Sequence, residues 1–266
     1  MKSLLNLLTL LILFSCSKAP KQESQSEPNP SKKIQRPLAA ENGKFFEMQN
    51  TRVLFGGEDS TLHFDVSNLT LQENQFHYGI GREAFPALLS PEFITMEAAD
   101  TIWADSTRFL VGSLNGETKA YSVPDLTRHE IVNDSLGGRP IMAAYCILAD
   151  LGAIYERDYN GKLLTFGLSG YTYFDEQVWN GLDGFVFWDR ETESLWWPLI
   201  GKAVSGPLEG VTLLEMDQQY WEDISWKEVK GKYSDVKVLA SGQDFERPNS
   251  WPKYGDVQSL VEQFRK

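Results

Sequence analysis

Cysteine is almost missing from this chain, which holds only Cys16 and Cys146 among its 266 residues. We expect Cys16 to carry a lipid, so it cannot pair with Cys146. An internal disulfide is therefore excluded from the mature chain. Basic residues are also scarce, with 25 Lys and Arg against 37 Asp and Glu. A nucleic-acid-binding domain needs a basic face, and this charge balance argues against that class.

Long hydrophobic runs are lacking as well. The longest begins at Leu4 and ends at Phe14, well short of the roughly 20 residues that span a membrane. A basic start, this apolar run and a small residue before Cys16 are typical of a secretory signal peptide. The alternative is an apolar helix buried in the fold. Because Leu13-Phe14-Ser15-Cys16 resembles the bacterial lipobox, we expect a signal peptide over residues 1–15 and a lipid on Cys16.

The segment 17–36 is rich in Ser, Pro, Gln and Lys and has too few apolar residues to bury a core. Together with Cys16 it reads as a lipidated, flexible tether over 16–36. It carries five basic and two acidic residues, a net charge of +3, whereas the chain from Pro37 onward has a net charge of −16. A basic tether suits an anionic membrane surface. No aspartate follows Cys16, which favours the outer membrane, facing the periplasm, over the inner membrane.

The rest of the chain is long enough for one sizeable core, and its turns favour β-structure. Asn115-Gly116 lies between two strand-like runs, a strong hairpin signal. Comparable turns occur at 133–138, 159–161 and 190–193, and consecutive hairpins build an antiparallel meander. We expect a mainly β fold, a sheet or partly closed barrel, with a few peripheral helices at 91–99, 225–233 and 256–265.

Several motifs stand in an order that resembles the bacterial family known as domain of unknown function 3179. In this chain, Phe85-Pro-Ala-Leu88 resembles the beginning of the family's sequence pattern, and Asp235-Val-Lys-Val-Leu239 resembles its end. The motifs between them are His129-Glu-Ile-Val-Asn-Asp134, Gly137-Gly-Arg-Pro140, Tyr145-Cys146, Leu164-Thr-Phe-Gly-Leu-Ser-Gly170, Asp189-Arg190, Thr192-Glu-Ser-Leu-Trp196 and Gly201-Lys-Ala-Val-Ser-Gly206.

The resemblance divides the folded part of the chain into an N-terminal extension that packs on the body (37–75), a family domain (76–241) and a C-terminal tail with a short helix (242–266). It implies no established activity. Members of the family usually continue Tyr-Cys-Pro-Leu-Cys-Gly, but here Ala149 replaces the second cysteine. A dithiol could cycle through a disulfide or hold a soft metal, and a single thiol cannot close a disulfide on itself.

His129 and Cys146 are the sharpest candidate residues, because the hairpin pattern places them on neighbouring strands. They could form a soft-metal site, for copper as an example, with a third ligand from Tyr145, Met142 or Asp150. They could also act as a nucleophile and its base. Alternatively, Cys146 is a small hydrophobic residue of the core and His129 bonds the turn. A ligand cleft would be formed by His129, Asn133, Asp134, Tyr145 and Cys146.

Other patterns favour packing over chemistry. Ser169 lies in a sequence one residue short of a nucleophile elbow, with no helix after it. Adjacent acidic residues such as Asp175-Glu176 point to opposite faces of a strand. Seven of the eight tryptophans follow residue 178; they favour a core, with Trp179 or Trp197 stacking on a sugar as the alternative.

Two functional hypotheses follow. The first is a lipid-anchored envelope protein that binds a small molecule or an envelope partner and has no enzymatic activity. The second is a thiol-based metal-handling or redox protein centred on Cys146 and His129. The location of Cys146 distinguishes them: a reactive thiol needs access and a depressed pKa, whereas a packing thiol is buried.

Overall fold

The computed structural model describes residues 41–179, 183–244, 253–255 and 257–265. The expected signal peptide, Cys16 and the tether lie outside the described residues. In the described part, no helix is long and apolar enough to cross a membrane. Residues 36–266 form one compact unit.

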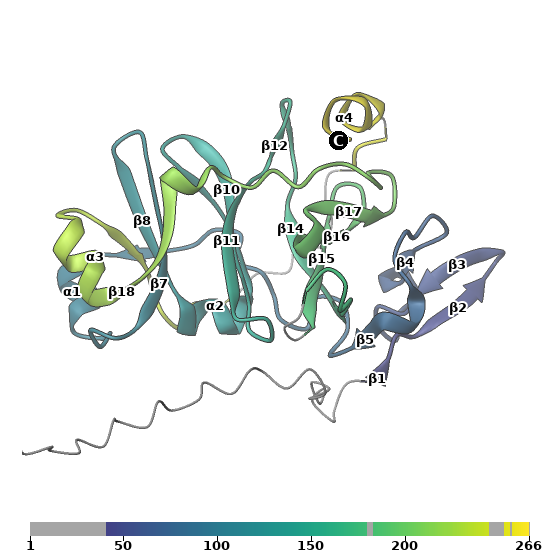
Figure 1. Ribbon diagram of the computed structural model, residues 1–266, viewed down its shortest axis with the longest axis horizontal. Helices are drawn as coiled ribbons and strands as arrows, with labels where there is room; N and C mark the ends of the chain where they lie inside the picture. The colour runs from purple at the N-terminus through teal and green to yellow at the C-terminus, as the bar shows by residue number, and fades with distance from the viewer. Residues whose placement is uncertain (1–40, 180–182, 245–252, 256, 266) are drawn as a thin grey trace, which may run out of the picture. The chain divides into compact units, whose positions relative to one another are not determined.

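The mainly β prediction is confirmed. Over the described residues the strands form five sheets, none of which closes into a barrel, and every strand pair is antiparallel except β8 with β19. Three of these sheets build most of the fold (Figure 1). The central sheet has the order β11-β10-β9, with β9 at Ile131–Leu136, β10 at Arg139–Cys146 and β11 at Leu151–Glu156.

The second sheet has five strands in the order β18-β7-β8-β19-β6 and the third has six in the order β1-β5-β14-β15-β16-β17. The five strands are β6 (Phe93–Ile94), β7 (Arg108–Leu114), β8 (Glu117–Ser122), β18 (Trp221–Ser225) and β19 (Lys237–Leu239). The six are β1 (Glu41–Asn42), β5 (Phe76–Tyr78), β14 (Phe166–Tyr173), β15 (Gly184–Asp189), β16 (Leu195–Trp197) and β17 (Lys202–Ser205).

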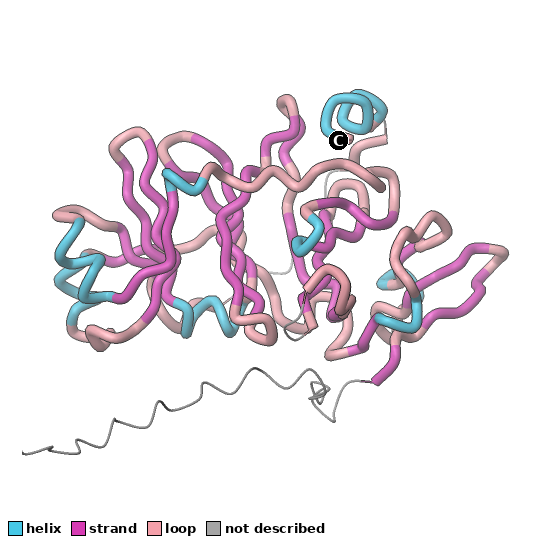
Figure 2. Tube along the Cα trace, in the orientation of Figure 1, coloured by secondary structure: helices cyan, strands magenta, loops and turns pink. Residues whose placement is uncertain are grey.

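Small sheets and short helices complete the fold (Figure 2). The small sheets contain β2 (Phe45–Met48), β3 (Thr51–Leu54), β4 (Phe64–Asp65), β12 (Asp158–Tyr159) and β13 (Lys162–Leu163). The α-helices are α1 (Met96–Asp100), α2 (Val123–His129), α3 (Trp226–Lys232) and α4 (Gln258–Phe264). The 3₁₀ turns are η1 (Ser60–Leu62), η2 (Glu73–Gln75), η3 (Pro198–Ile200) and η4 (Gln218–Tyr220).

The central sheet is buried on both faces, which explains the continuous apolar run of β10. Successive side chains of a strand point to opposite faces. Ile141, Ala143 and Tyr145 pack toward β7 and β8 of the five-stranded sheet. Met142 and Cys146 pack toward β14 and β15 of the six-stranded sheet. Cys146 therefore lies between two sheets.

The outer faces of the two larger sheets are covered by other parts of the chain. On the five-stranded sheet, Phe109 and Val238 pack against Trp226 and Val229 of α3. On the six-stranded sheet, Tyr171 and Trp188 pack with Leu54 and Phe64 of the N-terminal strands.

Three of the four predicted hairpins form with the expected turns. Asn115 and Asn160 both have positive φ, 51° and 56°, as do the glycines that follow them, which is the backbone that these turns require. The turn over residues 190–193 joins β15 to β16.

The second predicted hairpin is real but its limits were wrong. Asn133 and Asp134 belong to β9, and the turn consists of Gly137 and Gly138. His129 is not on a strand, because it is the last residue of α2.

Two of the three predicted helices are confirmed and the third begins later than expected. Ser225 and Glu228 form a capping box for α3, and α4 lies within 256–265. The helix predicted over 91–99 begins only at Met96, because Thr95 caps it and Phe93–Ile94 pair with β19 instead.

Candidate functional site

Asn133 is part of the framework between two sheets. Its side chain is buried, with 1% exposure. The amide nitrogen Nδ2 donates to the carbonyl of Phe166 at 2.8 Å, and Oδ1 accepts from the N–H of Phe166 at 2.9 Å and from Arg157 at 3.3 Å. In this way Asn133 imitates a strand pairing and joins β9 to β14. Its polar atoms are used by the protein itself.

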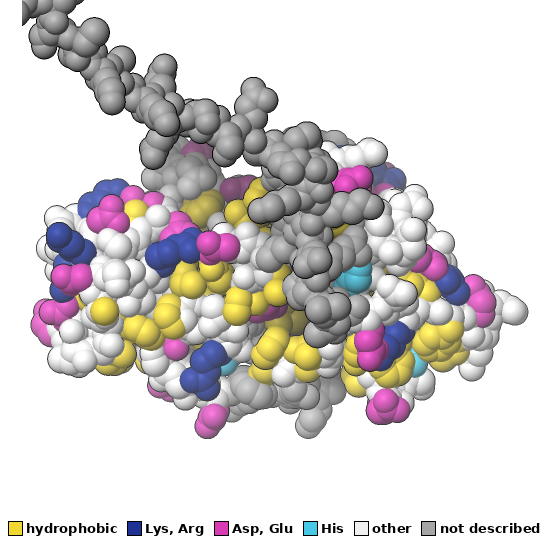
Figure 3. Space-filling view, turned by 60° about the horizontal axis from the view of Figure 1, so that its bottom comes forward, with side chains coloured by type: hydrophobic (Ala, Val, Ile, Leu, Met, Phe, Trp, Pro, Cys, Tyr) yellow, Lys and Arg dark blue, Asp and Glu magenta, His cyan; other side chains and the backbone are white. Residues whose placement is uncertain are grey.

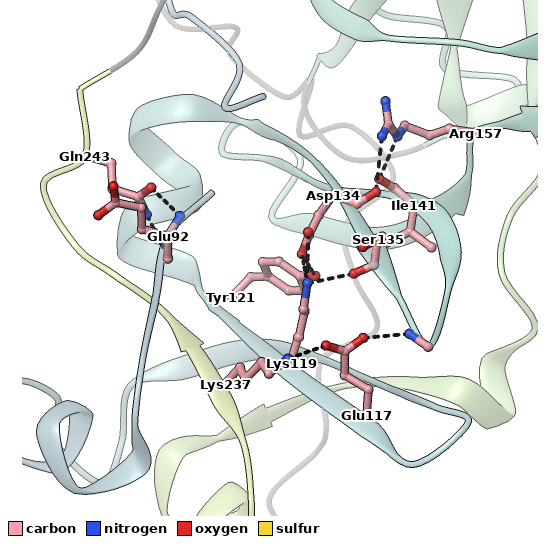
Figure 4. A network of polar contacts seen from close by, with 11 residues as sticks. Glu92, Glu117, Lys119, Tyr121, Asp134, Ser135, Ile141, Arg157, Lys237 and Gln243 are labelled. Carbon is pink, nitrogen blue, oxygen red and sulfur yellow. Dashed lines mark hydrogen bonds and ion pairs between the residues drawn. The ribbon is translucent and has the colours of Figure 1, made fainter. Parts of the chain in front are cut away.

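Asp134 is equally enclosed (Figure 4). Lys119 Nζ lies 2.9 Å from both of its carboxylate oxygens, and the hydroxyl of Tyr121 donates to Oδ2 at 2.8 Å. Asp134 and Lys119 are each 8% exposed at the side chain. The carboxylate raises the pKa of Tyr121, although burial is the larger cause. A buried ion pair with these partners positions β8 against β9.

Tyr145 and Asp150 pair with each other near the surface. The Tyr145 hydroxyl donates to Asp150 Oδ1 at 2.5 Å, and Arg108 lies 2.6 Å from the same oxygen. Burial, followed by the bond to Asp150, raises the pKa of Tyr145 to about 12. Of the proposed third ligands, Asp150 is therefore already an acceptor in an ion pair.

His129 and Cys146 make separate hydrogen bonds. His129 Nδ1 lies 3.0 Å from the carbonyl oxygen of Pro86. In the described part of the chain the Cys146 thiol donates to the carbonyl of Asp183 at 3.9 Å. Burial raises the pKa of Cys146 to about 11, so the thiol is protonated at neutral pH and a poor nucleophile. Among the described residues, no group of three or more His, Cys, Asp or Glu side chains could hold a metal ion.

Cys146 does, however, line a pocket. The pocket has a volume of about 180 Å³ and walls that are almost entirely apolar. Four of its residues are among the ten large hydrophobic side chains that are exposed in the described part of the chain: Ile80 (45%), Phe85 (40%), Ile147 (51%) and Leu148 (39%). Hydrophobic side chains gather in several groups on the face that carries α2 (Figure 3). An apolar pocket with an exposed apolar rim is typical of a binding site.

Among the described residues that line this pocket, Glu130 carries the one carboxyl group. Its side chain is only 9% exposed, and burial is the sole cause that raises the pKa of its carboxyl to about 7. Among the described residues no hydrogen bond or ion pair reaches this carboxyl group. Burial of a carboxyl that makes no hydrogen bond to the described residues destabilises the fold.

The backbone of Glu130 is unusual too. The residue follows α2 directly, where its N–H donates to Leu126 at 2.6 Å and its φ is 53°. Glycine is the usual residue at such a helix end, because a side chain at positive φ is strained. Strained residues of this kind cluster at functional sites.

Thr172 supplies a second polar group. Its hydroxyl donates to Asp183 Oδ2 at 3.0 Å, and the same carboxylate oxygen lies 2.6 Å from His77 Nδ1. The pocket is lined by Gly79, Ile80, Phe85, Glu130, Cys146, Ile147, Leu148, Leu168, Gly170, Tyr171, Thr172, Phe185 and Val186. It can therefore enclose an apolar group and present oxygen acceptors to a polar one.

The remaining residues considered in the sequence are structural or lie at the surface. Ser169 Oγ donates to the carbonyl of Val186 and accepts from the N–H of Tyr171 at a β-bulge in β14. Trp197 is 1% exposed, with its ring 4.6 Å from that of Tyr173. Trp179 is half-buried.

Cys146, a candidate from the sequence, thus lines the pocket together with Glu130, which no sequence pattern singled out. One signal was available. Ile147 and Leu148 follow Cys146 directly, lie in the β10–β11 turn and are exposed. Two large apolar residues in a turn are a mark of an interaction site.

Comparisons with known proteins agree with the resemblance noted in the sequence. No curated protein matches the chain, and no solved structure matches it either. The model of one family, described as "Protein of unknown function (DUF3179)", matches residues 82–263. The match includes the central sheet, Glu130 and Cys146, together with most of the rim of the pocket. The chain belongs to the DUF3179 family.

Proposed function

We propose that this protein is a lipid-anchored cell-envelope protein whose folded body binds a ligand in the pocket formed by Glu130 and Cys146. The observation that carries the proposal is the combination at Glu130: a strained backbone and a largely buried carboxyl that makes no hydrogen bond or ion pair to the described residues, at the edge of an apolar pocket. Both features destabilise the fold, and a ligand that contacts the carboxyl compensates for them.

The N-terminal segments supply the location. The lipobox-like sequence and the basic tether support an anchor in the outer membrane, with the body in the periplasm. In the periplasm the exposed rim of the pocket would be accessible to small molecules and to envelope proteins. Either class could provide the apolar group that enters the pocket.

The alternative is a thiol-based metal or redox site at Cys146 and His129. The geometry gives it less support, since burial raises the pKa of the thiol to about 11 and its hydrogen bond goes to Asp183. Cys146 contributes to the pocket as a small, weakly polar wall residue.

A pair of matched variants tests the ligand-binding proposal. Ile147, on the rim, and Ile102, outside the pocket, are both 51% exposed. The pocket volume of about 180 Å³ is large enough for one aromatic ring, so benzyl alcohol is the probe. Ligand-observed NMR measures its affinity for the full chain, which we expect to be about millimolar. Ile147→Ser should weaken binding several-fold and Ile102→Ser should leave it unchanged. Equal effects of the two variants, or no saturable binding to the parent chain, would contradict the proposal.

A further inference from the structure

The polar groups of the pocket share one property: they accept hydrogen bonds. The Glu130 carboxyl has no partner among the described residues and accepts whenever it is ionised. The hydroxyl proton of Thr172 is committed to Asp183 Oδ2, which leaves the oxygen lone pairs of Thr172 as acceptors. A ligand that satisfies both groups has to bring donors of its own.

The donors that the pocket side chains possess are already in use. The Cys146 thiol donates to the carbonyl of Asp183, and the Tyr171 hydroxyl donates to the carbonyl of Phe55 at 2.7 Å. The other side chains that line the pocket are aliphatic or phenyl groups. An anionic ligand would therefore find no charged partner in the pocket and would face the Glu130 carboxylate.

The charge of the whole body acts in the same direction. From Pro37 onward the chain has 35 acidic and 19 basic residues. A strongly negative protein concentrates cations near its surface and repels anions. Both the local acceptors and the long-range field thus select for positive charge.

We propose that the ligand of this pocket is an amphipathic amine, with its ammonium group on Glu130 and Thr172 and its apolar part against the hydrophobic walls. This inference rests on the proposed function and names the chemical class of the ligand. We take this amine to be a free small molecule. The test below distinguishes it from a lysine side chain of a partner protein.

The volume limits the size of the enclosed part. A cavity of about 150 Å³ holds a benzene molecule, so the 180 Å³ of this pocket accommodates one aromatic ring or a short alkyl chain with its amine. A longer ligand would extend over the exposed rim formed by Ile80, Phe85 and Ile147.

Three small ligands of equal shape test the inference on the full chain. Benzylamine is a cation, benzyl alcohol is neutral and benzoate is an anion at pH 8, where Glu130 is mostly ionised. We expect benzylamine to bind about tenfold or more tightly than benzyl alcohol, because its ammonium group forms an ion pair with the Glu130 carboxylate, whereas the neutral alcohol donates only a hydrogen bond. Benzoate should bind most weakly. Butylamine, which imitates a lysine side chain, should bind more weakly than benzylamine; tighter binding of butylamine would overturn the small-molecule assignment.

Two variants show whether the preference comes from Glu130. Glu130→Gln keeps the shape and removes the charge, so benzylamine and benzyl alcohol should bind this variant with similar affinities. Glu47→Gln removes one charge from a side chain that is 65% exposed on β2 and should leave the preference intact. Thermal unfolding verifies that both variants are folded. If either variant does not fold, the comparison of the ligands on the parent chain still tests the proposal.

The outcomes separate the two proposals. Binding of benzyl alcohol without a preference for benzylamine, or a preference that survives Glu130→Gln, overturns the amine assignment and leaves the proposed function standing. Absence of saturable binding for all the ligands overturns both.

Discussion

Glu130 combines two features that each oppose folding. A side chain in the left-handed region costs about 1 kcal/mol or more, and its buried carboxyl has a pKa of about 7 in place of 4.5. By contrast, the polar residues proposed from the sequence, Asn133 and Asp134, have all of their bonding capacity used inside the protein. Asn133 and Asp134 thus stabilise the fold, whereas Glu130 is the residue for which we propose a ligand.

The raised pKa of Glu130 makes a pH-dependent contribution to stability. The folded state keeps this proton up to about pH 7, whereas the unfolded state releases it near pH 4.5. The contribution is therefore fully present below pH 4.5 and is lost as the pH rises through 7. The shift corresponds to about 3 kcal/mol.

We expect the free energy of unfolding of the parent chain, relative to Glu130→Gln, to fall by about 3 kcal/mol between pH 4.5 and pH 8. Urea unfolding at the two pH values measures it. Asp189, whose burial raises its pKa to about 6, affects parent and variant alike and cancels in the difference. A difference that stays constant with pH would show that folding does not raise the pKa of Glu130.

At the scale of elements, the connection between sheets depends on single side chains. Asn133 holds the first residue of β14 against β9 with two hydrogen bonds, and Arg157 joins them through four more acceptors: Ile141, Asn133, Leu164 and the backbone of Asp134. This arrangement keeps β14, which carries Thr172, at a fixed place beside β10, which carries Cys146. The pocket is a product of that spacing.

Asn133→Ala should destabilise the protein by about 2–4 kcal/mol, because the N–H and C=O of Phe166 lose their partner in a buried place. Ser135→Ala on the same strand provides the control, since Ser135 is exposed and its loss should change stability by less than about 0.5 kcal/mol. Denaturant unfolding of the two variants measures both values. Equal stability of the two variants would show that Asn133 is dispensable for the pairing of the sheets.

Much of the element content could be predicted, and the failures have physical reasons. The Asn-Gly turns require positive φ at two adjacent positions, so they identify their hairpins without tertiary information. Helix α2 was missed although Ser122 caps it and Pro124 lies in its first turn, because seven residues give too little periodicity. As a result, His129 was predicted on a strand. Glu130 could not be singled out, because its unusual properties come from burial between elements that are distant in sequence.

At the scale of the whole molecule, the charges and the expected anchor belong together. A body of net charge −16 is repelled by an anionic membrane surface, whereas the basic tether is attracted to it. The expected result is a body that is tethered to the membrane through its N-terminal segment and is not itself attracted to the membrane surface. Lipid on Cys16 is required for this arrangement.

Cys16→Ser should remove the lipid and release the protein from the membrane. Fractionation of cells that express the parent chain or the variant measures the distribution, and incorporation of a labelled fatty acid measures lipidation. We expect the parent chain in the outer-membrane fraction with label and the variant outside that fraction without it. Cys146→Ser is the control and should behave as the parent chain does. Label in the Cys16→Ser variant would contradict the anchor.

The most direct test of the central claim is a methyl NMR spectrum of isoleucine-labelled full chain during a titration with benzylamine. Ile80 and Ile147 line the pocket, whereas Ile102 and Ile200 are exposed outside it. The account predicts saturable shifts of the Ile80 and Ile147 methyl signals, with Ile102 and Ile200 unmoved. Shifts spread over all four residues, or confined to the two outside the pocket, would show that the ligand binds elsewhere.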